Sequence, residues 1–132
     1  MEDNNKSPLE KYQEYWDIID YALSEGTSSG YKIAIIETEK ILAIAMDDKK
    51  IPGKNVAQKV KNAEVIFENP EKLNYARSIY EKLIKECGFA ISADETREIV
   101  SGYYKAIFDI VKMKSKKLPF KEKINFFLQR HF

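Results

Sequence analysis

The sequence predicts an all-α protein, built as an antiparallel helical bundle of four to five long helices and one short helix. Apolar residues recur at three- and four-residue spacing along most of the chain, which is the period of an amphipathic helix. The 132 residues contain no alternating strand pattern and no Asn-Gly or Asp-Gly hairpin turn. Short loops favour sequential helices that pack in opposite directions. We expect one domain over 1–132, with the bundle over 8–113 and a basic linker and C-terminal amphipathic helix over 114–132.

The first two helices are predicted from caps and apolar stripes. In "SPLE", Ser7 can cap the helix, Pro8 suits the first helical position and Glu10 completes a capping box. After "SEGTSSG", a second helix over 29–48 is apolar around most of its circumference, so we expect it at the centre of the bundle. The stripe of the first helix consists of Leu9, Tyr12, Trp16, Ile19 and Leu23.

The next two helices are delimited by proline, glycine and asparagine. "KKIPGKN" ends the second helix, because proline and glycine are unfavourable inside a helix. A short helix follows in "VAQKVKNAEVIF" with Asn55 as its cap, and Asn69-Pro70 begins a longer one. Gly88 is the expected left-handed stop of the longer helix. The apolar stripe of that helix consists of Leu73, Ala76, Tyr80, Leu83 and Cys87.

The last predicted helices begin at "SADE" and at "FKEKIN". Ser92 and Glu95 form a second capping box. The helix that they open directs inward Val100, Tyr103, Ile107, Ile110 and Val111. The basic linker "KMKSKKLP" precedes the C-terminal helix, whose apolar face consists of Phe120, Ile124, Phe127 and Leu128. We expect the core to bring together Trp16, Ile36, Leu42, Leu83 and Ile107.

The composition excludes several kinds of site. Cys87 is the only cysteine, so the chain forms no intrachain disulfide, which fits a reducing compartment and a cytoplasmic location. His131 is the only histidine, which excludes Cys/His metal sites and a histidine-dependent triad inside the bundle. We expect no metal and no cofactor. The acidic, polar N-terminus does not resemble a signal peptide, and the longest apolar stretch is too short and too charged to span a bilayer.

Charge is unevenly distributed along the chain. Residues 1–25 carry seven acids and two lysines, whereas residues 105–132 carry eight bases and two acids. The basic side chains could contact the phosphates of RNA or DNA. They could instead form a solubilising charge run, which is favoured because no base-stacking aromatic is clearly interleaved with them. The candidates for such contacts are Lys112, Lys114, Lys116, Lys117, Lys121 and Lys123.

The apolar face of the C-terminal helix needs a surface to cover it. A membrane surface is one alternative, but the helix is short and phenylalanines are usually buried. We expect Phe120, Ile124, Phe127 and Leu128 to pack against the bundle itself or across a homodimer. A two-fold dimer is the commonest way to bury such a face.

Three stretches together resemble a bacterial branch of the HEPN (higher eukaryotes and prokaryotes nucleotide-binding) superfamily. They are "YKIAIIETEKILAIAMDDKKIPGKNVAQKVKNA", "NPEKLNYARSIYEKLIKECGFAIS" and the helix ending "YYKAIFDIV". The resemblance covers about residues 12–112 and lies in the order and spacing of the pieces. It implies a helical bundle that commonly pairs, through the helices before and after "GFAIS", and in nuclease members it implies metal-independent RNA cleavage.

The nuclease motif of that superfamily, Arg-x4–6-His, is missing here. Aligned on Phe89 in "GFAIS", its positions hold Tyr80, Glu81 and Lys85, and Arg77 lies three residues too early. Cleavage needs a group that exchanges a proton near neutral pH, which is the role of histidine. Glu81 and Lys85 are four residues apart, the spacing of a surface ion pair. The resemblance therefore implies a scaffold helix without catalytic residues.

Three hypotheses about function follow. The first is a non-catalytic HEPN-like module for homodimerisation and for binding a partner, a nucleotide or a nucleic acid. The second is a divergent metal-independent ribonuclease that uses Lys85 or Arg77, and the third is a structural protein that binds partners through its C-terminal helix. Glu37, between Ile33 and Ile41, is either a polar remnant of a cleft or paired with Lys40 or Arg77.

Overall fold

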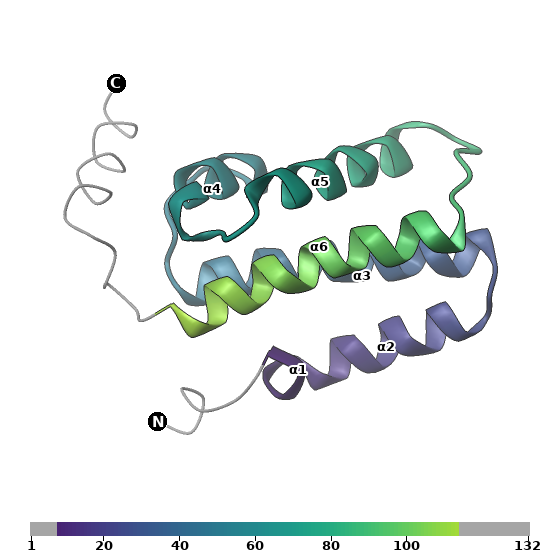
Figure 1. The fold of residues 1–132 in the computed structure, drawn as a ribbon, viewed down its shortest axis with the longest axis horizontal. Helices are drawn as coiled ribbons and strands as arrows, with labels where there is room; N and C mark the ends of the chain where they lie inside the picture. Colours follow the sequence, from purple (N-terminus) through teal and green to yellow (C-terminus); the bar gives the residue numbers. More distant parts are fainter. Residues whose placement is uncertain (1–7, 114–132) are drawn as a thin grey trace.

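The protein is helical, apart from connecting turns, over residues 8–113, the part of the chain that the computed structural model describes (Figure 1). No β-strand occurs within these residues, and the predicted all-α class is confirmed. The predicted linker and C-terminal helix lie outside the described residues. The elements in chain order are α1 (Pro8–Lys11), α2 (Gln13–Ser24), α3 (Ser28–Asp48), α4 (Val56–Asn62), the 3-10 turn η2 (Glu64–Ile66), α5 (Pro70–Lys85) and α6 (Ala93–Lys112).

The helix α3 occupies the middle of the bundle. It packs against α2, α5 and α6, and α5 also packs against α6. The helices α2 and α5 lie at opposite edges, with α3 and α6 between them (Figure 1). Buried side chains run along α3 from Ala34 to Met46. This agrees with the central position expected for the helix over 29–48. None of the described helices combines the length and the apolar composition needed to cross a membrane.

Helix starts follow the predicted capping residues. Asn55 caps α4 and Asn69 caps α5, where Pro70 takes the first helical position. At the start of α6, Ser92 Oγ accepts the backbone N–H of Glu95 at 3.1 Å, and Glu95 Oε1 accepts the backbone N–H of Ser92 at 3.1 Å. These caps satisfy backbone donors that have no partner within the helix. The predictions for all three starts are confirmed.

The turn between α2 and α3 brings two backbones close together. Thr27 caps α3 by accepting the backbone N–H of Gly30 at 3.0 Å. A Cβ atom added to Gly30 would lie 2.3 Å from the carbonyl oxygen of Ala22. That distance is well inside van der Waals contact, so the turn requires glycine at position 30.

The prediction of one continuous first helix is wrong, because the chain leaves the helix at Tyr12. This residue has φ −118° and ψ 39°, between the end of α1 and the start of α2. Its ring is buried, and its hydroxyl donates to Asp48 Oδ2 at the far end of α3, at 2.9 Å. Tyr12 and Asp48 are 36 residues apart, so the local spacing of apolar residues could not predict this hydrogen bond.

The end of α5 also differs from the prediction. The helix stops at Lys85, and Gly88 has a left-handed φ of +84°, as expected. Cys87 is exposed, so its predicted place on the inward stripe is wrong. It follows the last helical residue, where helical spacing no longer sets direction. Ile79, which the stripe omitted, is buried instead.

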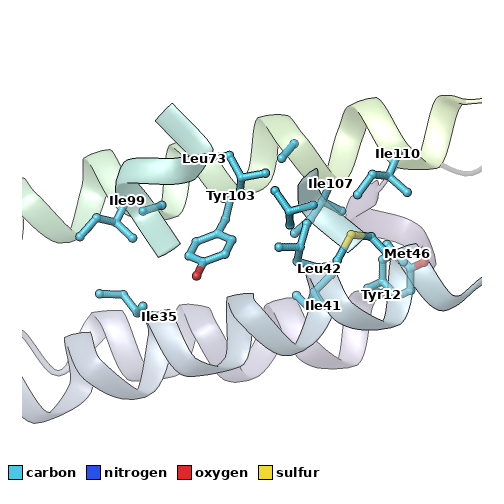
Figure 2. Packing of buried hydrophobic residues seen from close by; sticks show 14 of the residues in the cluster. Tyr12, Ile35, Ile41, Leu42, Met46, Leu73, Ile99, Tyr103, Ile107 and Ile110 are labelled. Carbon is cyan, nitrogen blue, oxygen red and sulfur yellow. The ribbon is translucent and has the colours of Figure 1, made fainter. Parts of the chain in front are cut away.

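The core lies between α3 and α6 and extends to α2 and α5 (Figure 2). Trp16, Leu42 and Ile107 belong to it, as predicted. Leu83 is half-buried and packs against the core, so the prediction holds in part for it. Ile36 is half-buried and does not belong to the core, so the prediction is wrong for Ile36. Ile36 is not fully buried because the inward face of α3 is centred on Ile35, Thr38 and Leu42. The largest fully buried side chains are Tyr103, Ile19, Ile35, Ile41, Leu42, Met46, Leu73, Ile99, Ile107, Ile110, Thr38 and Thr96.

Candidate functional site

The residues at the nuclease-motif positions lie along α5 and form no common site. Tyr80 is half-buried and packs against the core. Lys85 Nζ lies 3.7 Å from Glu81 Oε1, the predicted pair at four-residue spacing. The Lys85 side chain is 73% exposed. A catalytic lysine needs a desolvated setting, which this position does not provide.

Arg77 binds a carboxylate inside the bundle. Its Nε donates to Glu39 Oε1 at 3.1 Å and its Nη2 donates to Glu39 Oε2 at 2.8 Å. The two side chains are only 11% and 8% exposed. Two parallel N–H···O bonds between guanidinium and carboxylate form the strongest kind of ion pair. Glu81 Oε2 lies further away, 3.6 Å from the same Nη2.

Tyr103 completes the network from a third helix. It extends from α6 towards α3 (Figure 2), and its hydroxyl donates to Glu39 Oε1 at 2.7 Å. Glu39 therefore accepts three hydrogen bonds and joins α3 to both α5 and α6. A buried carboxylate with this many donors and a paired cation is fully compensated. The arrangement is that of a structural anchor.

The surroundings of Glu39 raise the pKa values of Arg77, Tyr103 and Tyr80, which lie above neutral pH already. Burial acts to lower the pKa of Arg77, but its hydrogen bonds to Glu39 and the charge of Glu39 outweigh burial and raise that pKa. Burial, and then the charge of Glu39, raise the pKa of Tyr103 and of Tyr80 above the ordinary tyrosine value. None of these three groups exchanges a proton near neutral pH, so they do not replace the missing histidine.

Sequence reasoning considered Lys40 or Arg77 as the partner of Glu37 and did not identify Glu39. Glu37 pairs with Lys40 at 3.0 Å, which was one of its two expected partners. Glu39 is the buried carboxylate, four residues after Ile35 and three before Leu42, which are both fully buried. That spacing on the inward face of α3 is a signal that could have identified Glu39.

A pocket of about 520 Å³ opens beside Arg77, between α4, η2 and α5. Its polar lining is Lys61, Glu64, Asn74, Arg77, Ser78 and Glu81. Two acids accompany the two cations, and Arg77 is already bound to Glu39. The pocket therefore offers no excess of positive charge, which phosphate recognition requires.

A second hollow, of about 630 Å³, lies between α2 and α6, and we refer to it as the α2–α6 groove. The rings of Trp16 and Tyr104, both in its lining, pack edge to face with their centroids 5.4 Å apart. Its surface is mostly apolar, and sequence reasoning, which assigned Trp16 and Val100 to the core, missed it. The lining consists of Trp16, Leu23, Tyr31, Ala93, Thr96, Arg97, Val100, Ser101 and Tyr104.

No protein-family model, curated protein or solved structure matches this chain. The chemistry of the network, the pocket and the groove is therefore what bears on function.

Most of the predicted binding residues lie outside the described part of the chain. Lys112 is exposed at the end of α6, with its Nζ 4.8 Å from the centroid of the Phe108 ring. Within residues 8–113, no cluster of His, Cys, Asp and Glu side chains could hold a metal ion. The remaining predicted residues, outside this range, are Lys114, Lys116, Lys117, Lys121, Lys123, Phe120, Ile124, Phe127 and Leu128.

Proposed function

We propose that this chain is a non-catalytic, HEPN-like antiparallel bundle that binds an amphipathic helix of a protein partner. The α2–α6 groove carries the proposal. It is a mostly apolar hollow between α2 and α6 with Tyr31 of α3 in its lining, and such grooves receive the apolar face of a further helix. Its lining includes the polar side chains of Thr96, Arg97 and Ser101 on α6. Asp20 follows Trp16 by four residues on α2 and is exposed.

The state of Arg77 supports the non-catalytic part of the proposal. An arginine that acts on a phosphate must present its N–H groups to the substrate, and Arg77 instead directs its Nε and one N–H of Nη2 at Glu39. Lys85, the other candidate of a divergent ribonuclease, lies in solvent beside Glu81. A ribonuclease that used either residue would need a different arrangement of α5.

The charge of the pocket favours a protein partner over a nucleotide or nucleic acid. Lys61 and Arg77 are opposed there by Glu64 and Glu81, so the pocket does not attract phosphates. The HEPN resemblance also implies pairing of two copies, and we include this pairing in the proposal, together with the cytoplasmic location that a single cysteine favours. Light scattering of the full chain at micromolar concentration tests it, and a monomeric mass throughout would remove pairing while leaving the groove unaffected.

Binding in the groove can be followed through Trp16, the only tryptophan of the chain. Its indole N–H gives one resonance in a nitrogen–proton correlation spectrum. A synthetic amphipathic helix of leucine and lysine should shift this resonance in a saturable way. Val100→Lys in the groove should weaken the binding about tenfold or more, because a lysine is desolvated there. Val65→Lys, at a position 60% exposed on η2, is the matched control.

The outcomes separate the hypotheses. Saturable binding that Val100→Lys weakens and Val65→Lys does not supports the groove. A Trp16 resonance unchanged by the peptide would reject it. In parallel, the protein is incubated with single-stranded and structured RNA, with and without magnesium, and we expect no cleavage. Cleavage that disappears in Lys85→Ala or Arg77→Lys would establish the divergent ribonuclease instead.

A further inference from the structure

We infer that the α2–α6 groove is occupied, in the protein at rest, by the C-terminal segment of the same chain, residues 118–132. This inference rests on the proposed function of the groove and adds its regulation. A partner helix would have to displace the chain's own segment before it could bind.

The chain is long enough to reach the groove. The α6 residues that line it run from Ala93 to Tyr104, which is about 17 Å along the helix axis. From Tyr104 to the end of α6 at Lys112 is about 12 Å more. Residues 113–117 can span up to about 17 Å, so the segment can turn back over α6. A helix over 120–132 would be about 20 Å long, close to the length of the groove.

The groove and the segment both present apolar and aromatic side chains that could pack against each other. Phe120, Ile124, Phe127 and Leu128 recur at four, three and one residues, the pattern of anchors on a helix that lies in a groove. The groove presents half-buried apolar and aromatic side chains, at Leu23, Tyr31, Val100 and Tyr104. Burial of these two surfaces against each other would remove apolar area from water on both sides.

Helix α2, which forms one wall of the groove, is opposite in charge to the segment. Helix α2 exposes Glu14, Asp17 and Asp20 and contains no lysine or arginine. The segment and the linker before it carry the bases Lys114, Lys116, Lys117, Lys121, Lys123 and Arg130 and the single acid Glu122. Opposite charges on α2 and on the segment would favour docking beside α2, although Arg97 in the lining has the same sign as the segment, and would make the docking sensitive to salt.

Tethering strengthens a weak contact of this kind. A segment on a short linker is present at a millimolar effective concentration. A segment whose own affinity is near 0.1 mM would then be docked most of the time, and a competing helix would bind about tenfold more weakly than to an empty groove. The groove would respond to partners only above a threshold concentration.

The test compares two full-length variants that differ at adjacent phenylalanines. Phe127→Ser removes an anchor from the apolar face, whereas Phe126→Ser changes a residue that helical spacing puts on the opposite side. A labelled peptide of residues 118–132 is titrated into each variant and into the unchanged chain. We expect Phe127→Ser to bind the peptide about tenfold more tightly than the other two. The Trp16 indole resonance should shift in Phe127→Ser before any peptide is added.

Each alternative has its own outcome. Equal affinity of all three proteins for the peptide would show an empty groove and overturn the inference, while the proposed function would stand. If the peptide fails to bind any of them but the leucine–lysine helix binds, the inference also fails alone. Failure of both probes rejects the proposed function as well. A Trp16 shift in Phe127→Ser that depends on protein concentration would assign the segment to a second copy, which also overturns the inference.

Discussion

Arg77 of α5 and Glu39 of α3 are joined by two hydrogen bonds, of 3.1 and 2.8 Å, within the bundle. Placing both charges there costs desolvation free energy, which the paired geometry and the hydroxyl of Tyr103 offset. Loss of one partner leaves the other charge buried without compensation. The pair is therefore a point at which small changes have large effects on stability.

Arg77→Ala should lower the free energy of unfolding by about 3 kcal/mol, because it leaves the Glu39 carboxylate buried without its cation. Arg77→Lys should also be destabilising, since lysine cannot form the two-point contact. Urea denaturation measures both. Arg97→Ala is the control, as Arg97 and its partner Asp94 are 76% and 91% exposed, and it should change stability by no more than about 0.5 kcal/mol. Equal effects of Arg77→Ala and Arg97→Ala would contradict the role of the buried pair.

Stability should fall as the pH rises above about 10, the ordinary pKa of tyrosine. Tyr103 has a raised pKa in the folded state, so the folded protein holds this proton more tightly than the unfolded chain does. Its contribution is fully present below pH 10 and is lost above it, by up to about 1.4 kcal/mol per pH unit.

Denaturation between pH 8 and 11 checks this dependence. Tyr103→Phe should flatten it, at a cost of about 1 kcal/mol at neutral pH for the lost hydrogen bond to Glu39. Tyr21→Phe, at a side chain that is 73% exposed, should keep the slope of the unchanged protein. An identical slope in the Tyr103→Phe variant would refute the assignment.

Gly30→Ala should be destabilising by about 2 kcal/mol or more, although alanine normally favours a helix. The added Cβ would lie 2.3 Å from the Ala22 carbonyl oxygen, so α2 and α3 would have to separate. Ser29→Ala, the neighbouring exposed position of α3, should be close to neutral. Thermal unfolding followed by circular dichroism compares the two. A stabilised Gly30→Ala protein would show that the close approach does not exist.

Ser92→Ala should cost about 1 kcal/mol, because it removes one half of the capping box of α6. Ser101→Ala makes the same substitution at an exposed position inside the same helix. There alanine is the better helix former, so the change should be neutral or slightly stabilising. Chemical denaturation of both variants decides. Similar losses at the two positions would mean that the cap contributes nothing specific.

Helix starts and the all-α class could be predicted because their causes are local. A cap such as Asn55, a proline such as Pro70 and a box such as Ser92 with Glu95 act within four residues of one another. These short patterns can therefore be recognised in a sequence without knowledge of the tertiary structure. The left-handed turn at Gly88 is of the same kind.

The break at Tyr12, the pairing of Glu39 with Arg77 and Tyr103, and the α2–α6 groove could not be predicted in the same way. Each depends on residues far apart in sequence, such as the Tyr12 hydroxyl and Asp48. Periodicity shows that Trp16 is apolar and inward, but it does not show that α6 leaves a hollow beside it. Tertiary contacts decide these features, and propensity is only a weak guide to them.

The position of Glu39 also bears on the order in which the chain folds. The pairs α2–α3 and α5–α6 are each close in sequence, whereas Glu39 lies 38 residues from Arg77 and 64 from Tyr103. We therefore expect its carboxylate to stay hydrated until the two helical pairs meet, so that the network closes late on the path to the native state. Glu39→Gln should accordingly speed unfolding and leave the folding rate nearly unchanged, in stopped-flow kinetics across a range of urea concentrations. The Glu39 carboxylate would then set the rate at which the assembled bundle unfolds, and so the lifetime of the native state.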